Sequence, residues 1–355
     1  MRIRRRLPII IGVLAVIAAV AIVVELRRHA PPEPARLLPG ADAFLYVNLQ
    51  WVRRVSTIKQ LPPVSHDPDY EKFIQDTGIQ FERDLDRAAF AVHYPATWGG
   101  TGMGAKTNEP RFSEVFEGNI HADKLVPYLR KSASSIDDYR SAEIFNIPLE
   151  DRTLRVSILG VDTVAVSNSD DPSVIRGIID RSRKLASPFA GPLLLRRYYK
   201  EVPIASLAWA IVRVNGSDTR FPLANGIWSL LFQKPATLVV STRFLRAVHL
   251  RAEAFADTPE DAQRTADQVR TLLNVFHAAE SSAGGSGVDP DVKEFFDSLK
   301  VDQKDSRAVL TATLAPQFLR KMVAEPPPEL IPQAPTSPTP APPPSSKPKK
   351  RRHKA

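Results

Sequence analysis

The sequence predicts an α+β fold of antiparallel or mixed sheets with helices, after one N-terminal transmembrane helix. Three observations lead to this prediction. Hydrophobic residues make up 43% and charged residues 25% of the 355 residues, as in an ordinary globular protein. Segments typical of strands outnumber two-residue hairpin turns and alternate irregularly with segments typical of helices, which favours helices on one face of the sheets. An uncharged apolar run occupies residues 7–24.

The apolar run is long enough to cross a bilayer. As a helix, its 18 residues would span about 27 Å, close to the roughly 30 Å of a hydrocarbon core. Four arginines precede the run and only Arg27 and Arg28 follow it closely, which favours a cytoplasmic N-terminus. We therefore expect residues 1–6 to be a cytoplasmic basic end and residues 7–26 to be an uncleaved signal anchor in the lipid bilayer.

A cleaved signal peptide is the alternative for this run. Its apolar region would have about 7–15 residues and would lead into a cleavage site of small residues. Here the run is longer and leaves through Glu25 and two arginines. The sequence therefore favours an anchor of a bacterial inner-membrane protein, single-pass, with the bulk of the chain periplasmic or extracellular.

The rest of the chain divides by composition. Residues 27–40 are rich in proline and are expected to form an extended linker. Residues 41–200 and 201–325 are expected to form a first and a second α+β half. Residues 326–355 contain 11 prolines and end in a basic cluster, so we expect a disordered Pro-rich tail.

Seven segments of the globular part are apolar or aromatic enough to be strands. They are Ala43–Leu49, Ala88–Tyr94, Leu154–Leu159, Thr163–Val166, Ser206–Val214, Thr237–Phe244 and Val248–Phe255.

Helices are expected where an acid or a hydroxyl residue precedes proline, at Asp67, Asp171, Thr258 and Asp289. The first residue can cap free backbone N–H groups, and proline fits the first helical position. The clearest helix covers about residues 259–281, and we expect its apolar stripe to pack on the domain's own sheet rather than on a partner.

A weak internal repeat suggests that the two halves are related. Residues 67–74 resemble residues 289–296, and residues 113–115 resemble residues 307–309 in a strand that runs into a helix. The spacing between the two blocks differs. Chance similarity between two amphipathic helices therefore stays open as the other interpretation.

The net charge of +9 belongs to the two ends of the chain. Residues 1–29 and 326–355 each contribute +5, so residues 30–325 carry −1. A nucleic-acid-binding domain usually carries its basic stripe within the folded part, which is here close to neutral. Instead, the tail is the candidate contact with an anionic surface or polymer. Its cations are Lys347, Lys349, Lys350, Arg351, Arg352 and Lys354.

No motif for catalysis, a cofactor or a metal stands out. The chain has no cysteine, and its seven histidines do not have zinc-site spacing. Residues 99–107 nearly spell a phosphate loop, but Ala105 stands where glycine is required, and strand-like segments lie on both sides. We expect a flexible connection there, no phosphate contact by Lys106, and neither catalytic residues nor a cofactor.

Three smaller polar features are interpreted structurally. Asp67 begins a sequence like that of a calcium loop, but Lys72 replaces the obligatory glycine, so a helix cap is expected. His121 precedes a helix and is also expected to cap it. The acids Glu82 and Asp84 lie near the entry to a strand and are expected in a solvated turn.

The layout resembles uncharacterised bacterial proteins that carry an N-terminal signal anchor and an exported α+β region. The resemblance rests on Arg4–Arg6 with the apolar run, on Pro39–Asn48 and on Asp76–Asp86. It implies a location in the envelope and transfers no activity.

These observations leave three hypotheses about function. The first is a non-enzymatic envelope protein that presents an interaction domain outside the cytoplasm to a partner of unknown identity. The second is an anchored hydrolase of an envelope polymer, and the third is polyanion binding through the tail. The lack of a recognisable catalytic set favours the first.

Overall fold

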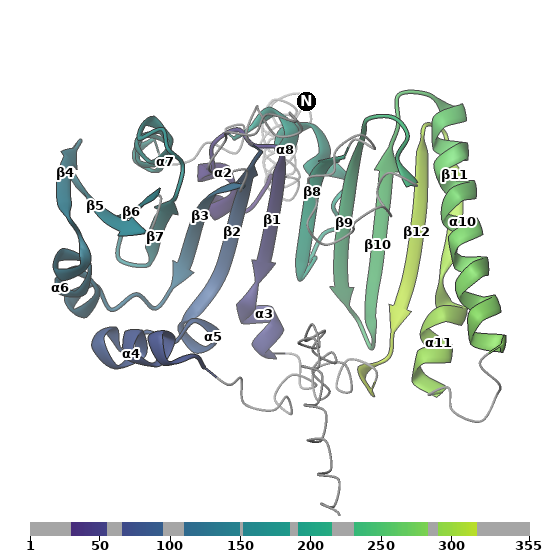
Figure 1. Ribbon diagram of the computed structural model, residues 1–355, viewed down its shortest axis with the longest axis horizontal. Coiled ribbons are helices and arrows are strands. Elements are labelled where there is room, and N and C mark those ends of the chain that lie inside the picture. Colours follow the sequence, from purple (N-terminus) through teal and green to yellow (C-terminus); the bar gives the residue numbers. More distant parts are fainter. Residues whose placement is uncertain are drawn as a thin grey trace, which may run out of the picture.

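A computed structural model of the chain describes residues 30–54, 66–94, 110–149, 152–184, 191–214, 231–282 and 290–317. The described residues form an α+β fold around one large antiparallel sheet (Figure 1). The fold class predicted from the sequence is confirmed at this level. The apolar run at residues 7–24 lies outside the described residues. Among those residues, no helix combines the length and the apolar character needed to cross a membrane.

The strands are β1 (Ala43–Asn48), β2 (Leu85–His93), β3 (Arg111–Gly118), β4 (Ser135–Tyr139), β5 (Ala142–Leu149), β6 (Arg152–Ile158), β7 (Thr163–Ser167), β8 (Ala208–Val214), β9 (Ala236–Phe244), β10 (Val248–Phe255), β11 (Lys300–Lys304) and β12 (Arg307–Leu314). The helices are α2 (Glu33–Leu37), α3 (Leu49–Arg54), α4 (Pro68–Thr77), α5 (Phe81–Asp84), α6 (Ala122–Ser132), α7 (Ser173–Arg183), α8 (Leu193–Tyr198), the 3-10 helix η2 (Tyr199–Glu201), α10 (Pro259–Ser282) and α11 (Pro290–Ser298). All seven predicted strands are present, with ends that differ by up to three residues.

The described strands lie in the order β11-β12-β10-β9-β8-β1-β2-β3-β7-β6-β5-β4. Figure 1 shows β4 and β11 at the two ends of this sheet, with α10 and α11 beside β11 and β12. Strand β1 pairs with β2 on one side and with β8 on the other, both antiparallel. Strands from before and after residue 200 therefore share one sheet.

Helices pack on both faces of the first part of the sheet. One buried cluster joins α2, α7 and α8 to one face, through residues such as Phe44, Val115 and Ile178. A second cluster joins α6 to the opposite face, through residues such as Leu129 and Phe145. The expectation of helices on one face is therefore wrong, because alternate residues of these strands are buried on each side.

In the second part of the sheet, α10 packs on the face reached by Ala254 and Ala308. Ala266 of α10 is fully buried against this cluster. The expected packing of this helix on the domain's own sheet is confirmed. Its N-terminus is capped as predicted, since the Thr258 hydroxyl accepts a hydrogen bond from the Asp261 backbone N–H at 3.2 Å.

Of the expected side-chain caps at the N-termini of α4 and α6, only that of α4 is present. The Asp67 side chain accepts from the Tyr70 backbone N–H at 2.8 Å, which confirms the expected cap of α4. This helix ends at Gly78, whose φ of 71° and backbone N–H bond to Ile74 complete the C-terminal cap. The His121 side chain makes no capping hydrogen bond to α6, so that expectation is wrong.

Two further expectations are corrected. Residues 33–38 are no extended linker: α2 begins with proline in its first turn, and Leu37 and Leu38 are buried in the core. The segment around Glu82 and Asp84 is no solvated turn either. Asp84 is only 7% exposed and accepts the Gln80 backbone N–H at 2.8 Å.

Candidate functional site

The charged side chains of the second part of the sheet gather on one of its two faces. Strands β8 to β12 alternate along their length, so residues that carry apolar side chains toward α10 are interleaved with polar ones. We call the face opposite α10 the basic face. Its charged residues are the cations Arg213, Arg243, Arg251, Lys300, Lys304 and Arg307 and the carboxylates Glu253 and Asp302.

The strand register aligns these residues in rows across the sheet. One row runs from Arg213 through Thr237, Phe255 and Arg307 to Lys304, each directly opposite the next. Directly opposite residues project from the same face. Four inter-strand spacings of about 4.8 Å make this row about 19 Å wide.

The next row on this face is buried except at its end and consists of Ile211, Val239, Glu253, Val309 and Asp302. Two more rows lie further along the strands. In the first, Ser241 is opposite Arg251, which is opposite Thr311, which is opposite Lys300. In the second, His249 stands between Arg243 and Thr313. The His249 Nδ1 lies 3.3 Å from the Thr313 hydroxyl oxygen. These two rows therefore combine basic groups with hydroxyl side chains.

The most buried charge of this face is Glu253, whose side chain is 3% exposed. Its carboxylate is 2.6 Å from Arg251 Nε and 3.1 Å from Arg307 Nη1. The same Arg307 nitrogen is 3.0 Å from the Glu201 carboxylate in η2. The charge of Glu253 is thus compensated by two arginines, and the network holds η2 against the sheet.

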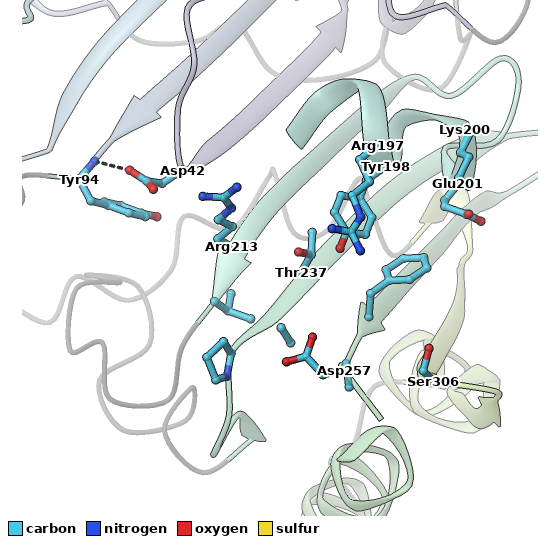
Figure 2. Close-up of a pocket in the computed structure, with 15 residues that line it drawn as sticks. Asp42, Tyr94, Arg197, Tyr198, Lys200, Glu201, Arg213, Thr237, Asp257 and Ser306 are labelled. Atoms are coloured by element: carbon cyan, nitrogen blue, oxygen red, sulfur yellow. Dashed lines mark hydrogen bonds between the residues drawn. The ribbon is translucent and has the colours of Figure 1, made fainter. Parts of the chain in front are cut away.

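A cavity of about 550 Å³ opens on this face beside α8 (Figure 2). Figure 2 shows Arg213 on one side of it and Arg197 with Tyr198 on the other, with Thr237 between them. The Arg197 guanidinium lies 5.3 Å from the centre of the Tyr198 ring. Cations and an aromatic ring therefore converge on the same space.

Acidic groups also line this first cavity, but two of them are engaged. Asp42 accepts the Tyr94 backbone N–H at 3.0 Å, and Glu201 is paired with Arg307. Asp257 is exposed and reaches into the cavity from its rim (Figure 2). The first cavity is thus a mixed polar site, lined by three cations and three carboxylates.

A second cavity of about 360 Å³ lies on the same face. It is lined by cationic and hydroxyl side chains of the two further rows, and none of its described lining residues is a carboxylate. Arg243, Arg251, Lys300 and His249 contribute its basic groups. This cavity has the composition expected of a site for an anionic group.

The carboxyl groups with raised pKa lie elsewhere. Burial raises the pKa of Glu114 to about 6. Burial also raises the pKa of Glu117 to about 7, and the nearby Arg87 acts in the opposite direction. Both residues belong to β3 and line neither cavity. Neither of these two carboxyl groups can therefore act as an acid or base on a ligand in either cavity.

Other residues singled out from the sequence are distributed as follows. The tail cations at positions 347–354 and the glycine-rich segment at 99–107 lie outside the described residues. His93 lies in β2, 3.1 Å from the Ser113 hydroxyl. Within the described ranges, no cluster of three His, Asp or Glu side chains could hold a metal ion.

The basic face was missed by sequence reasoning. Its period-two pattern is visible in Val248–Phe255, where His249, Arg251 and Glu253 alternate with small or apolar residues. The pattern alone does not reveal which strands are neighbours, so the gathering of cations from five strands could not be foreseen.

Comparisons with known proteins add little. No protein-family model matches the chain, and no curated protein is significantly similar to it. The similar solved structures include crystal forms III and I of TP0453, both 13% identical in sequence, with TM-scores of 0.40 and 0.38. The alignments cover 83% of this chain and 98% and 97% of those chains. This similarity is too low to carry an argument about fold or function.

Proposed function

We propose that the chain is a membrane-anchored protein of the bacterial envelope whose α+β region is a non-enzymatic interaction domain. In this proposal, residues 7–26 cross the inner membrane once with the N-terminus in the cytoplasm. Residues 30–355 lie in the periplasm or outside the cell. The uncharged run and its arginine prefix support this topology.

The basic face is the observation that carries the proposal. It combines unpaired cations, hydroxyl side chains and two cavities on one side of β8 to β12. Arg213, Lys300 and Lys304 are exposed, and none has an ion-pair partner among the described residues. Such groups are available to a ligand without breaking a contact that holds the fold.

The structure bears differently on the two other functions considered from the sequence, an anchored hydrolase and polyanion binding through the tail. An anchored hydrolase would need convergent acid and base groups, and the raised pKa values of Glu114 and Glu117 belong to groups outside both cavities. Polyanion binding through the tail, residues 347–354, is compatible with the proposal, because the tail would add a second basic contact.

We also propose that the two parts of the sheet descend from one unit. In each part, a helix that begins at the proline of an Asp-Pro step, α4 or α11, precedes an antiparallel pair of strands, β2–β3 or β11–β12. Val115 and Val309, which correspond in the repeat, are both buried on the same face of the sheet.

Site-specific photo-crosslinking in intact bacteria tests the proposed function. A photoreactive amino acid replaces Lys304 on the basic face or, as a control, exposed Lys131 on α6. We expect adducts in the envelope fraction from position 304 only, with no release of soluble fragments from isolated envelopes. Equal adducts from both positions, or adducts with cytoplasmic components alone, would overturn the proposal.

A further inference from the structure

The basic face carries a local positive charge, although the domain as a whole is close to neutral. Residues 30–325 carry a net charge of −1. Here the charged strand residues of this face, together with the other charged residues that line the first cavity, are eight cations and five carboxylates. One of these carboxylates, Glu253, is already compensated by Arg251 and Arg307. A ligand that complements the remaining charge must therefore be anionic.

The arrangement of the two cavities indicates an extended ligand. The row of Thr237 and Phe255 in the first cavity is six residues along the strands from the row of Arg243 and His249 in the second. At about 3.4 Å per residue these rows lie about 20 Å apart. A small anion can fill only one of the cavities, whereas a linear polymer can reach both.

The side chains between the cations favour hydroxyl-rich polymers. Ser241 and Thr311 lie in the same row as Arg251, and Thr313 is in the row of His249. Hydroxyl groups both donate and accept hydrogen bonds, as sugar hydroxyls require. Arginine pairs with carboxylates through two parallel hydrogen bonds.

Other polyanions fit this face less well. Proteins bind single-stranded nucleic acid by stacking its bases on successive aromatic side chains. Of the two cavities, only the first is lined by Tyr or Phe side chains, and there the ring centres of Tyr198 and Phe255 are 5.2 Å apart. A lipid surface is flat and would not fill the two cavities of this face. A protein partner would need an exposed apolar centre. The apolar residues Ile211, Val239 and Val309 of this face are buried in the domain itself, and in the first row Phe255 is the one apolar residue.

From this chemistry we infer that the basic face binds a linear acidic polysaccharide, whose carboxylates pair with the cations of both cavities. In the first cavity, a sugar ring packs on Tyr198 or Phe255 while Arg213 and Arg197 bind its charged groups. In the second, Lys300 and Arg243 bind a further carboxylate. This inference rests on the proposed function and names the class of ligand.

The test measures binding of polygalacturonate, a linear uronic-acid polymer, to the full chain in a zwitterionic detergent. The six tail cations are changed to glutamine in every sample, so that the tail does not contribute. One variant carries Arg213→Gln, Lys300→Gln and Lys304→Gln. The matched control carries Lys72→Gln, Lys131→Gln and Lys184→Gln, which remove the same charge from exposed positions in α4, in α6 and directly after α7.

We expect the basic-face variant to bind at least about tenfold more weakly, since three exposed ionic contacts are lost. The control variant should bind like its parent, and both folds should give the same circular dichroism spectrum. Methyl-esterified polygalacturonate should bind weakly, because its carboxylates are blocked, and galacturonate monomer should not compete. Added salt should weaken binding steeply.

Three results would overturn the inference: equal loss of affinity in both variants, equal binding of the esterified polymer, or tighter binding of an oligothymidylate of the same charge. The experiments distinguish failure of the proposed ligand class from failure of the proposed cellular role. If crosslinks form at position 304 but polygalacturonate does not bind, only the ligand class is wrong. If polygalacturonate binds but position 304 does not contact the envelope, the proposed cellular role is wrong.

Discussion

The buried carboxyl group of Glu117 makes the stability of the domain depend on pH. Its side chain is 7% exposed, and Arg87 Nε lies 2.6 Å from Oε2. That oxygen nevertheless has no well-aligned hydrogen bond within the described part of the chain. Burial therefore dominates and raises the pKa from 4.5 to about 7, despite the opposing effect of Arg87.

The direction in which pH changes the stability follows from the number of protons bound by the folded and the unfolded chain. Between pH 4.5 and 7, the folded protein keeps the Glu117 proton while the unfolded chain has lost it. Raising the pH through this window therefore destabilises the fold. A difference of 2.5 between the two pKa values corresponds to about 3 kcal/mol at 1.36 kcal/mol for each unit.

Urea denaturation of residues 30–355, which include every described element, measures this effect. Fluorescence of the buried Trp209, which stacks on Tyr46, reports unfolding. We expect the wild type to lose about 3 kcal/mol between pH 4.5 and 8 through this group, and Glu117→Gln to remove that part of the slope. Glu114, with a pKa of about 6 from burial, gives a smaller slope of the same sign in both proteins. An unchanged slope in Glu117→Gln would refute the reasoning.

Four further changes have expected outcomes. Asp67→Ala removes the cap of α4 and should cost about 1 kcal/mol in urea denaturation. Ala266→Leu overfills the fully buried contact of α10 with the sheet and should cost about 1–3 kcal/mol in the same assay. Lys106→Ala should change stability by less than about 0.5 kcal/mol, and nucleotides should not raise the melting temperature of the wild type. Removal of residues 326–355 should abolish the salt-sensitive part of binding to anionic vesicles that we attribute to the tail.

Apolar strands could be predicted from the sequence because burial leaves a local pattern. Segments such as Ala43–Leu49 are apolar or aromatic at every position except Asn48, since they lie in the interior of the sheet. The edge strands β4 and β11 were missed because they lack this pattern, whereas β5 was missed although its Ile144 and Phe145 are buried. β4 is exposed along most of its length and contains Asp137 and Asp138, so nothing apolar marks it.

The remaining errors come from contacts that are distant in the sequence. Prolines around residues 31–39 indicate an extended chain, yet Leu37 and Leu38 fill a gap in the core formed by α7 and the sheet. The sequence around Asp84 is typical of a surface acid, but Arg83 compensates the charge of its buried carboxylate and the Gln80 backbone N–H donates a hydrogen bond to it. The basic face depends on the register of five strands, which no local pattern encodes.

The central claim is that an exported domain presents its basic face to the envelope. Since the chain has no cysteine, Lys304→Cys and the control Lys131→Cys can each be labelled alone. The measurement is the rate of labelling by a membrane-impermeant maleimide in intact spheroplasts, relative to the rate in the purified protein. We predict that both sites are labelled without lysis and that position 304 alone is slowed in the spheroplasts. Labelling that requires lysis, or equal relative rates at both sites, would contradict the account.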